Sequence, residues 1–121
     1  MILAYPPAAP SCNSNFTSSG IQVSTSTDYG TVPLPPLALT APDDSAGHGG
    51  TDICSAGTVS TVSSFLTTYM PQKGWNLHSS SSGQQVWKSS SGCIQVVISN
   101  STDWTITWPN KAIGQPFADC T

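Results

Sequence analysis

Residues 101–108, STDWTITW, alternate between apolar and polar side chains, as a half-buried β-strand does. Trp104, Ile106 and Trp108 point to one side of such a strand, and the polar residues between them point to the other side. Two tryptophans on one strand face indicate either a buried core or an aromatic platform for a ligand. The segments before this strand decide between the two interpretations.

An amphipathic helix is predicted over residues 58–70, because apolar residues recur there at helical spacing and Pro71 follows directly. Four strands are expected after it, since short runs rich in Ser and Gly separate β-prone segments. Short connections of this kind favour antiparallel pairing. The helical stripe consists of Val59, Val62, Phe65, Leu66 and Tyr69, and the expected strands are 75–78, 84–88, 93–99 and 103–108.

The predicted fold class is therefore α+β, with one amphipathic helix packed on a four-stranded antiparallel meander. Ile94, Val96 and Ile98 form one strongly apolar face of the third strand. Together with the apolar face of the strand at 103–108, they are expected to lie under the helix. This arrangement favours the core interpretation of the two tryptophans.

The first 50 residues are predicted to be a Pro/Ser/Thr-rich extended arm that precedes a helix-plus-sheet domain at 51–121. Seven of the ten prolines lie in the first 42 residues, and proline removes a backbone donor and restricts the residue before it. One short strand is expected in the arm, at 21–25. An ordered arm must bury surface, so we expect it to cross part of a sheet, either its own or a neighbour's.

Four cysteines lie far apart in the chain, at Cys12, Cys54, Cys93 and Cys120, with no C-x-x-C pair. This spacing disfavours a zinc site and predicts two disulfides formed in an oxidising compartment. Two sets of pairings stay open. Cys54 could join Cys93 while Cys12 joins Cys120, or Cys12 could join Cys93 and fix the arm on the open sheet face.

Charged residues are scarce: three lysines, no arginine, six aspartates and no glutamate leave a net charge of −3. Binding to nucleic acid or to an anionic membrane surface needs clustered basic residues, so the sequence predicts no nucleic-acid partner and disfavours binding to an anionic membrane surface. No apolar segment approaches the ~20 residues that span a membrane. An export signal or membrane anchor is expected to lie outside this sequence.

No catalytic motif is present, and the sequence predicts a protein that is not an enzyme and that needs no metal or cofactor. Asp43, Asp44, His48 and Asp52 form the best acidic cluster for a hard cation. Their spacing matches no calcium loop, and Asp and Gly are ordinary turn residues. His78 borders a serine run, where nothing positions it for nucleophilic catalysis.

A candidate contact face is predicted on the side of the sheet opposite the helix. Trp87 is the best candidate for an exposed tryptophan, which could either be covered by the arm or stack against a sugar. The alternative to a protein-contact function is therefore a small carbohydrate-binding module. The predicted face consists of Trp87, Gln85, Gln95, Thr105 and Thr107.

Two segments match the N-glycosylation pattern, NFT at Asn15 and NST at Asn100. A chain so rich in Ser and Thr produces such matches by chance, so the pattern alone makes these two asparagines candidates and no more.

Between residues 32 and 108 the chain carries, in order, PLPPL, CSAGT, FLTTYM, GW, VWK, CIQVVIS and DWTITW. This pattern resembles a group of uncharacterised exported domains of filamentous soil bacteria, some of them attached to membrane-anchored proteins. The resemblance implies an extracellular or cell-surface setting and no assigned chemistry.

The low charge, the hydroxyl-rich strands and an arm able to add to a neighbour's sheet edge favour a function through contact. The sequence therefore predicts a non-catalytic, exported cell-surface domain that acts through self-assembly or through contact with another surface protein. A structural subunit of an extracellular assembly is one such role.

Overall fold

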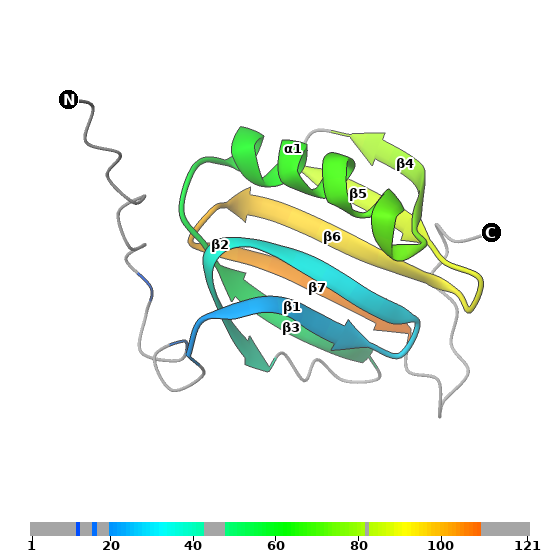
Figure 1. Ribbon diagram of the computed structural model, residues 1–121, viewed down its shortest axis with the longest axis horizontal. Coiled ribbons are helices and arrows are strands. Elements are labelled where there is room, and N and C mark those ends of the chain that lie inside the picture. Colours follow the sequence, from blue (N-terminus) through cyan, green and yellow to red (C-terminus); the bar gives the residue numbers. More distant parts are fainter. Residues whose placement is uncertain (1–11, 13–15, 17–19, 43–47, 82, 110–121) are drawn as a thin grey trace.

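The computed structural model of the protein describes residues 12, 16, 20–42, 48–81 and 83–109. These residues form one seven-stranded antiparallel sheet in the order β1-β2-β3-β7-β6-β5-β4, with one α-helix and one short 3-10 helix (Figure 1). The elements are β1 (Gln22–Thr27), β2 (Gly30–Pro42), β3 (His48–Cys54), α1 (Val59–Tyr69), η1 (Pro71–Lys73), β4 (Asn76–Ser81), β5 (Gln84–Lys88), β6 (Cys93–Asn100) and β7 (Asp103–Pro109).

The predicted fold class is wrong, because the protein is mostly β and its sheet has seven strands instead of four. The helix and the last four strands form where the sequence places them, within a few residues. Three further strands come from the part of the chain that the sequence predicts to be an extended arm with one short strand at 21–25; β1 confirms that strand, and β2 and β3 are additional. β3 spans the expected boundary near residue 50 and pairs with both β2 and β7, so residues 20–54 contribute to the same sheet.

β2 is a strand of 13 residues despite its four prolines. It pairs with β1 through residues 30–33 and 38, and with β3 through residues 39–42. Its first half therefore has a strand neighbour on one edge only. Pro33 and Pro35 have no backbone N–H to donate. One edge of this half of β2 has no neighbouring strand among the described residues and needs no donors, and a sheet tolerates proline at such an edge.

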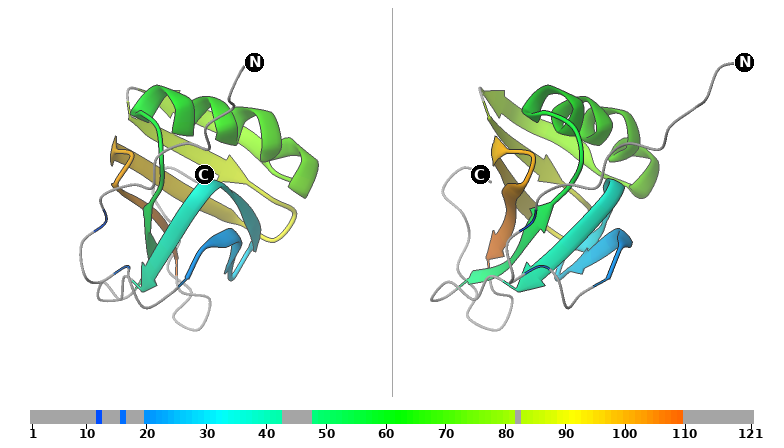
Figure 2. Two further views of the ribbon diagram at one scale, coloured as in Figure 1. Left: turned by 60° about the vertical axis from the view of Figure 1, so that its left-hand side comes forward. Right: turned by 90° about the vertical axis from the view of Figure 1, so that its left-hand side faces the viewer.

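The two halves of β2 meet at a bend. Leu37 has a φ of 62°, in the left-handed region that residues other than glycine seldom adopt. The pairing with β1 is irregular at the same place, since Gln22 lies opposite Ala38 and Ser24 lies opposite Pro33. Before the bend, β2 pairs with β1 alone, and this β1–β2 hairpin lies over the layer formed by the other strands (Figures 1 and 2).

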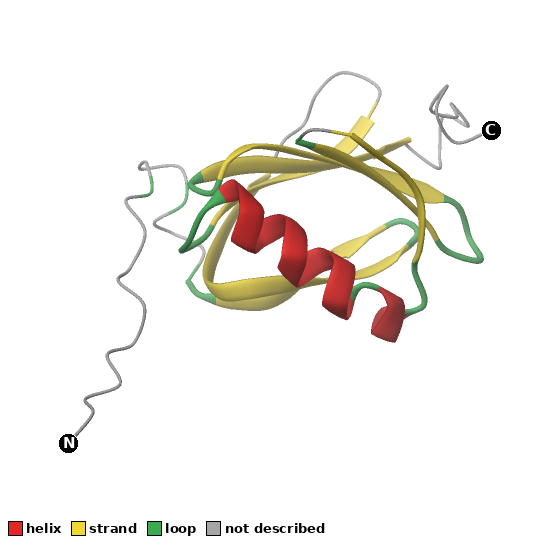
Figure 3. Cartoon of the chain, turned by 90° about the horizontal axis from the view of Figure 1, so that it is seen from above, coloured by secondary structure: helices red, strands yellow, loops and turns green. Residues whose placement is uncertain are grey.

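α1 lies beside the β1–β2 hairpin and packs against β2 and β6. Seen from above, the strands curve around the core, and α1 lies on the side of the core that the strands leave open (Figure 3). Thr58 caps the helix, since its hydroxyl accepts a hydrogen bond from the Thr61 amide and its own amide donates to the Thr61 hydroxyl. Val62 and Leu66 are buried, whereas Val59 and Tyr69 are exposed. The core-facing stripe is therefore narrower than predicted.

The apolar face of β7 lies in the core, as predicted. Trp104 pairs with Ile98 and Ile106 pairs with Val96, so these side chains share one face of the sheet. The ligand-platform interpretation of β7 is therefore excluded. The main core consists of Val32, Leu34, Ala38, Ile53, Val62, Leu66, Met70, Trp75, Trp87, Ile94, Val96, Ile98, Trp104, Ile106 and Trp108.

Two hydrogen bonds join the tip of the β1–β2 hairpin to the other end of the sheet. The indole N–H of Trp75, just before β4, donates to the Thr31 carbonyl at 2.8 Å. The Ser89 hydroxyl, just after β5, donates to the Tyr29 carbonyl at 2.7 Å. Elements that are far apart in the strand order therefore meet, and the hairpin is held over the core.

Replacing Trp75 by Phe tests this closure. The variant keeps an aromatic ring in the core but leaves the Thr31 carbonyl without the indole donor, so we expect the free energy of unfolding to fall by about 1–3 kcal/mol. Trp108→Phe is the matched control, because that indole makes no hydrogen bond within the described residues. Urea unfolding followed by circular dichroism measures both, and equal losses for the two variants would contradict the proposed role of the Trp75 N–H.

Candidate functional site

Two residues of the predicted contact face lie in the core instead. Trp87 pairs with Ile94 and Gln85 pairs with Val96, so both point to the helix-covered face. Their exposed fractions are 1% and 2%. The expectation of an exposed Trp87 is therefore wrong.

The buried amide of Gln85 connects the sheet to the helix. Its Oε1 accepts a hydrogen bond from the indole N–H of Trp87 at 2.9 Å, and its Nε2 donates to the Ser63 hydroxyl of α1 at 3.1 Å. Because Oε1 and Nε2 of this buried amide both have hydrogen-bond partners, the side chain joins β5 to α1 and has no free group for a ligand.

The other three residues of the predicted face do lie together on the outer face of the sheet. Gln95 is directly opposite Thr107 on the neighbouring strand, and Thr105 is opposite Val97. All of these side chains are half-buried. On this face β6 and β7 carry polar side chains together with Val97, and both tryptophans of β7 lie on the opposite, core-facing side.

Part of the outer face is covered by residues from the N-terminal segment. A second, smaller apolar cluster forms there, in which Phe16 is buried with Ala41 and Cys54, and Cys12 and Leu39 pack against them. The expected arm therefore contacts the outer face of the sheet at Cys12 and Phe16, whereas its residues 22–42 belong to the sheet as β1 and β2.

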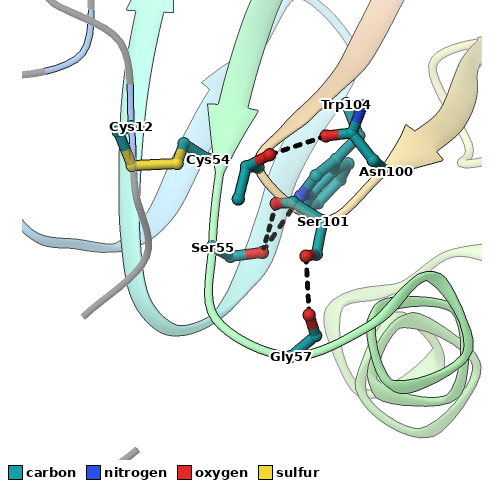
Figure 4. Close-up of a disulfide and its surroundings, with 8 residues drawn as sticks. Cys12, Cys54, Ser55, Gly57, Asn100, Ser101 and Trp104 are labelled. Atoms are coloured by element: carbon teal, nitrogen blue, oxygen red, sulfur yellow. Dashed lines mark hydrogen bonds between the residues drawn. A yellow bond between two sulfur atoms is a disulfide. The ribbon is translucent and has the colours of Figure 1, made fainter. Parts of the chain in front are cut away.

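Both predicted sets of disulfide pairings are wrong, because Cys12 is bonded to Cys54, with their Cα atoms 5.9 Å apart (Figure 4). Cys54 ends β3 on the outer face, opposite Leu39 of β2, so the bond fixes the N-terminal segment to that face. Cys93 is also disulfide-bonded. Cys120 lies outside the described residues.

A group of hydroxyls lies beside the Cys12–Cys54 disulfide (Figure 4). The Ser55 side chain is fully buried, accepts a hydrogen bond from the Trp104 indole at 3.1 Å and donates to the Ser101 carbonyl at 3.3 Å. The Ser101 hydroxyl donates to the Gly57 carbonyl at 2.6 Å. These bonds join the β6–β7 turn to the segment that enters α1, which is a structural role. No sequence pattern separates Ser55 from the many other serines.

The predicted acidic cluster is only partly described. Asp43, Asp44 and the side chain of His48 lie outside the described residues. Asp52 lies on the outer face of β3, opposite Ala41 and Thr105. Within the described part of the chain, no group of three His, Cys, Asp or Glu side chains could hold a metal ion. His78 lies on β4, whose residues are all exposed.

The most exposed large apolar side chains of the described residues lie at the start of the sheet's first edge strand, β1. Ile21, directly before the strand, is 63% exposed, and Val23 is 82% exposed. The only strand paired with β1 among the described residues is β2. The alternation at 21–25 predicts this strand, but only the sheet order shows that it is an edge.

Comparison with protein-family models, with curated proteins and with solved structures finds no match to this chain. The family resemblance therefore stays a prediction. No helix in the described residues is long and apolar enough to cross a membrane.

Replacing Gln85 by Leu separates a structural role from a contact role. The variant leaves the Trp87 indole and the Ser63 hydroxyl without their partner, so we expect the free energy of unfolding to fall by about 1–3 kcal/mol. Gln84→Leu is the matched control on the outer face, where we expect a change within about 0.5 kcal/mol. Chemical denaturation measures both variants, and an unchanged stability of Gln85→Leu would contradict the structural role.

Removing the disulfide with the double variant Cys12→Ala and Cys54→Ala tests how strongly the N-terminal segment is held. The bond joins residues 42 apart in sequence, and the loop-entropy model gives a loss of about 4 kcal/mol. Phe16→Ala is the companion variant, since it removes the apolar contact and keeps the bond. Thermal unfolding under oxidising conditions measures both, and a double variant as stable as the parent would contradict the model.

Proposed function

We propose that this protein is a non-catalytic, exported cell-surface domain that acts through self-assembly or through contact with another surface protein, by strand addition at the β1 edge. A structural subunit of an extracellular assembly is the role that fits best. The observation that carries the proposal is the pair of exposed apolar side chains, Ile21 and Val23, beside the edge strand.

Edge strands of soluble proteins are commonly protected by charged side chains, by proline or by bulges, because their unpaired backbone groups can pair with another chain. The segment 20–27 contains no charged residue and no proline. An irregularity between Gln22 and Ser24 interrupts the pairing with β2, which leaves Ser24–Thr27 as the regular part of the strand. The contact would therefore combine a short backbone ladder with the side chains of Ile21 and Val23.

The partner that requires the fewest assumptions is a second copy of this chain. Its net charge is −3, so two copies repel each other weakly. The other edge strand, β4, also carries no Asp, Glu, Lys or Arg, and its Leu77 is 44% exposed. Neither edge therefore places like charges at a contact between two copies.

Export is the second part of the proposal. Cys12, Cys54 and Cys93 are all disulfide-bonded, and disulfides form and persist in oxidising compartments. A domain with very few charged side chains has few ion pairs, so covalent bonds would contribute a large share of its stability. Both observations support an extracellular or cell-surface location.

The carbohydrate-binding alternative loses the feature that suggested it. All four tryptophans are at least 92% buried, and the indole N–H of Trp87 donates a hydrogen bond to the buried Gln85 side chain. No observation on the described surface favours a glycan as the partner.

Replacing Val23 by Lys tests the assembly. A lysine at this edge puts a charge where the second chain would pack, so we expect the dissociation constant of the assembly to rise at least about tenfold, which corresponds to ~1.4 kcal/mol. Val59→Lys is the matched control, because Val59 is exposed on α1 and belongs to neither edge strand. Light scattering over a range of concentrations measures all three proteins in the oxidised state.

Two results would contradict the proposal. A parent protein that stays monomeric at millimolar concentration would rule out self-assembly. An assembly that Val23→Lys leaves intact, while Leu77→Lys disperses it, would move the contact from β1 to β4.

A further inference from the structure

We infer that Asn100 is an acceptor for an N-linked glycan. The inference rests on the export part of the proposed function, because the modification takes place only in a secretory compartment. The sequence pattern Asn100–Ser101–Thr102 by itself made the residue no more than a candidate. The conformation of the β6–β7 turn adds three independent observations.

The first observation is exposure. Asn100 is the last residue of β6 and its side chain is exposed. It pairs with Asp103 across the two-residue turn that starts β7. A bulky, hydrated group on this side chain would therefore extend into solvent, and none of the core contacts would have to change.

The second observation is the hydrogen bond between the two ends of the pattern. The Thr102 hydroxyl donates to Asn100 Oδ1 at 2.8 Å. The carbonyl side of the amide is thereby occupied, and the amide Nδ2 is the atom to which the sugar would be attached. The hydroxyl that the pattern requires two residues after the asparagine is thus already in contact with the acceptor amide.

The third observation is how the turn is held. The middle residue, Ser101, faces inward, where its hydroxyl donates to the Gly57 carbonyl and its own carbonyl accepts from the Ser55 amide at 2.8 Å (Figure 4). Ser101 is therefore the residue that joins the turn to the segment before α1. Asn100 and Thr102 bond to each other outside that network, which leaves them available for modification.

The chemistry is a substitution at the anomeric carbon of a lipid-linked oligosaccharide pyrophosphate. Nδ2 of Asn100 forms the new N–C1 bond, the bond between C1 and the pyrophosphate oxygen breaks, and the proton from Nδ2 passes to a base of the transferase. The lipid pyrophosphate is the leaving group, and no oxidant or reductant takes part.

The test is translation of the full chain, with an endoplasmic-reticulum leader in front of it, in the presence of microsomes. Only protein protected from added protease is analysed, so import is established in the same sample. We expect a band of higher mass that peptide N-glycosidase F returns to the unmodified mass, with Asn100 converted to Asp in the peptide map.

Four variants locate the site. Asn100→Gln and Thr102→Ala should each lose the glycan at residue 100 completely, whereas Thr102→Ser should keep it at least in part, because a hydroxyl remains. Ser101→Ala should also keep it, although it weakens the turn, which separates loss of the acceptor from loss of the local fold. Asn15→Gln should leave the glycan at residue 100 unchanged.

Imported, protease-protected protein in which Asn100 is unmodified would overturn the inference. This failure is distinct from failure of the proposed assembly. Light scattering measures association of the unglycosylated protein, and the microsome experiment measures modification of a chain whose import is forced by the added leader.

Discussion

The bend in β2 is the constraint on which the rest of the fold depends. Up to Ala38 the strand pairs with β1, and from Leu39 it pairs with β3, so one continuous strand supplies both layers of the molecule. The left-handed backbone at Leu37 costs about 1–3 kcal/mol, and the apolar contacts that the bend makes possible offset this cost. Without the bend, the hairpin would extend the sheet instead of lying over the core.

The core buries three indole N–H groups that each donate to an acceptor within the described residues. Trp75 donates to the Thr31 carbonyl, and the other two buried indoles with a described partner donate to polar side chains. Those side chains, Gln85 and Ser55, are the buried polar residues of the described core. Both accept a hydrogen bond from a buried indole, so a polar residue in this sequence does not by itself indicate a surface.

The outside of the molecule follows from the same composition. Hydroxyls and amides replace charged groups on the strands, so the surface is hydrated but offers little electrostatic repulsion to another copy. The exposed apolar residues of β1 lie on an edge of the sheet, where backbone pairing and side-chain contact can act together. A turn held through Ser101 places Asn100 at the surface without disturbing the layers beneath it. The proposed contact and the proposed modification thus involve separate parts of the sheet.

The sequence by itself determined the elements whose side chains alternate strongly: the helix at 58–70, the last four strands and the buried face of β7. Local alternation is enough there, because one face is clearly apolar. In β5, Val86 and Trp87 are adjacent, so either face could be the buried one, and only the register with β6 placed Trp87 inside. The prolines of β2 indicated irregular chain because proline removes a donor. Whether a donor is needed depends on which strand lies alongside, and only the tertiary structure decides that. The same holds for the Cys12–Cys54 bond, since the distance between two cysteines in space is not encoded in their separation along the chain.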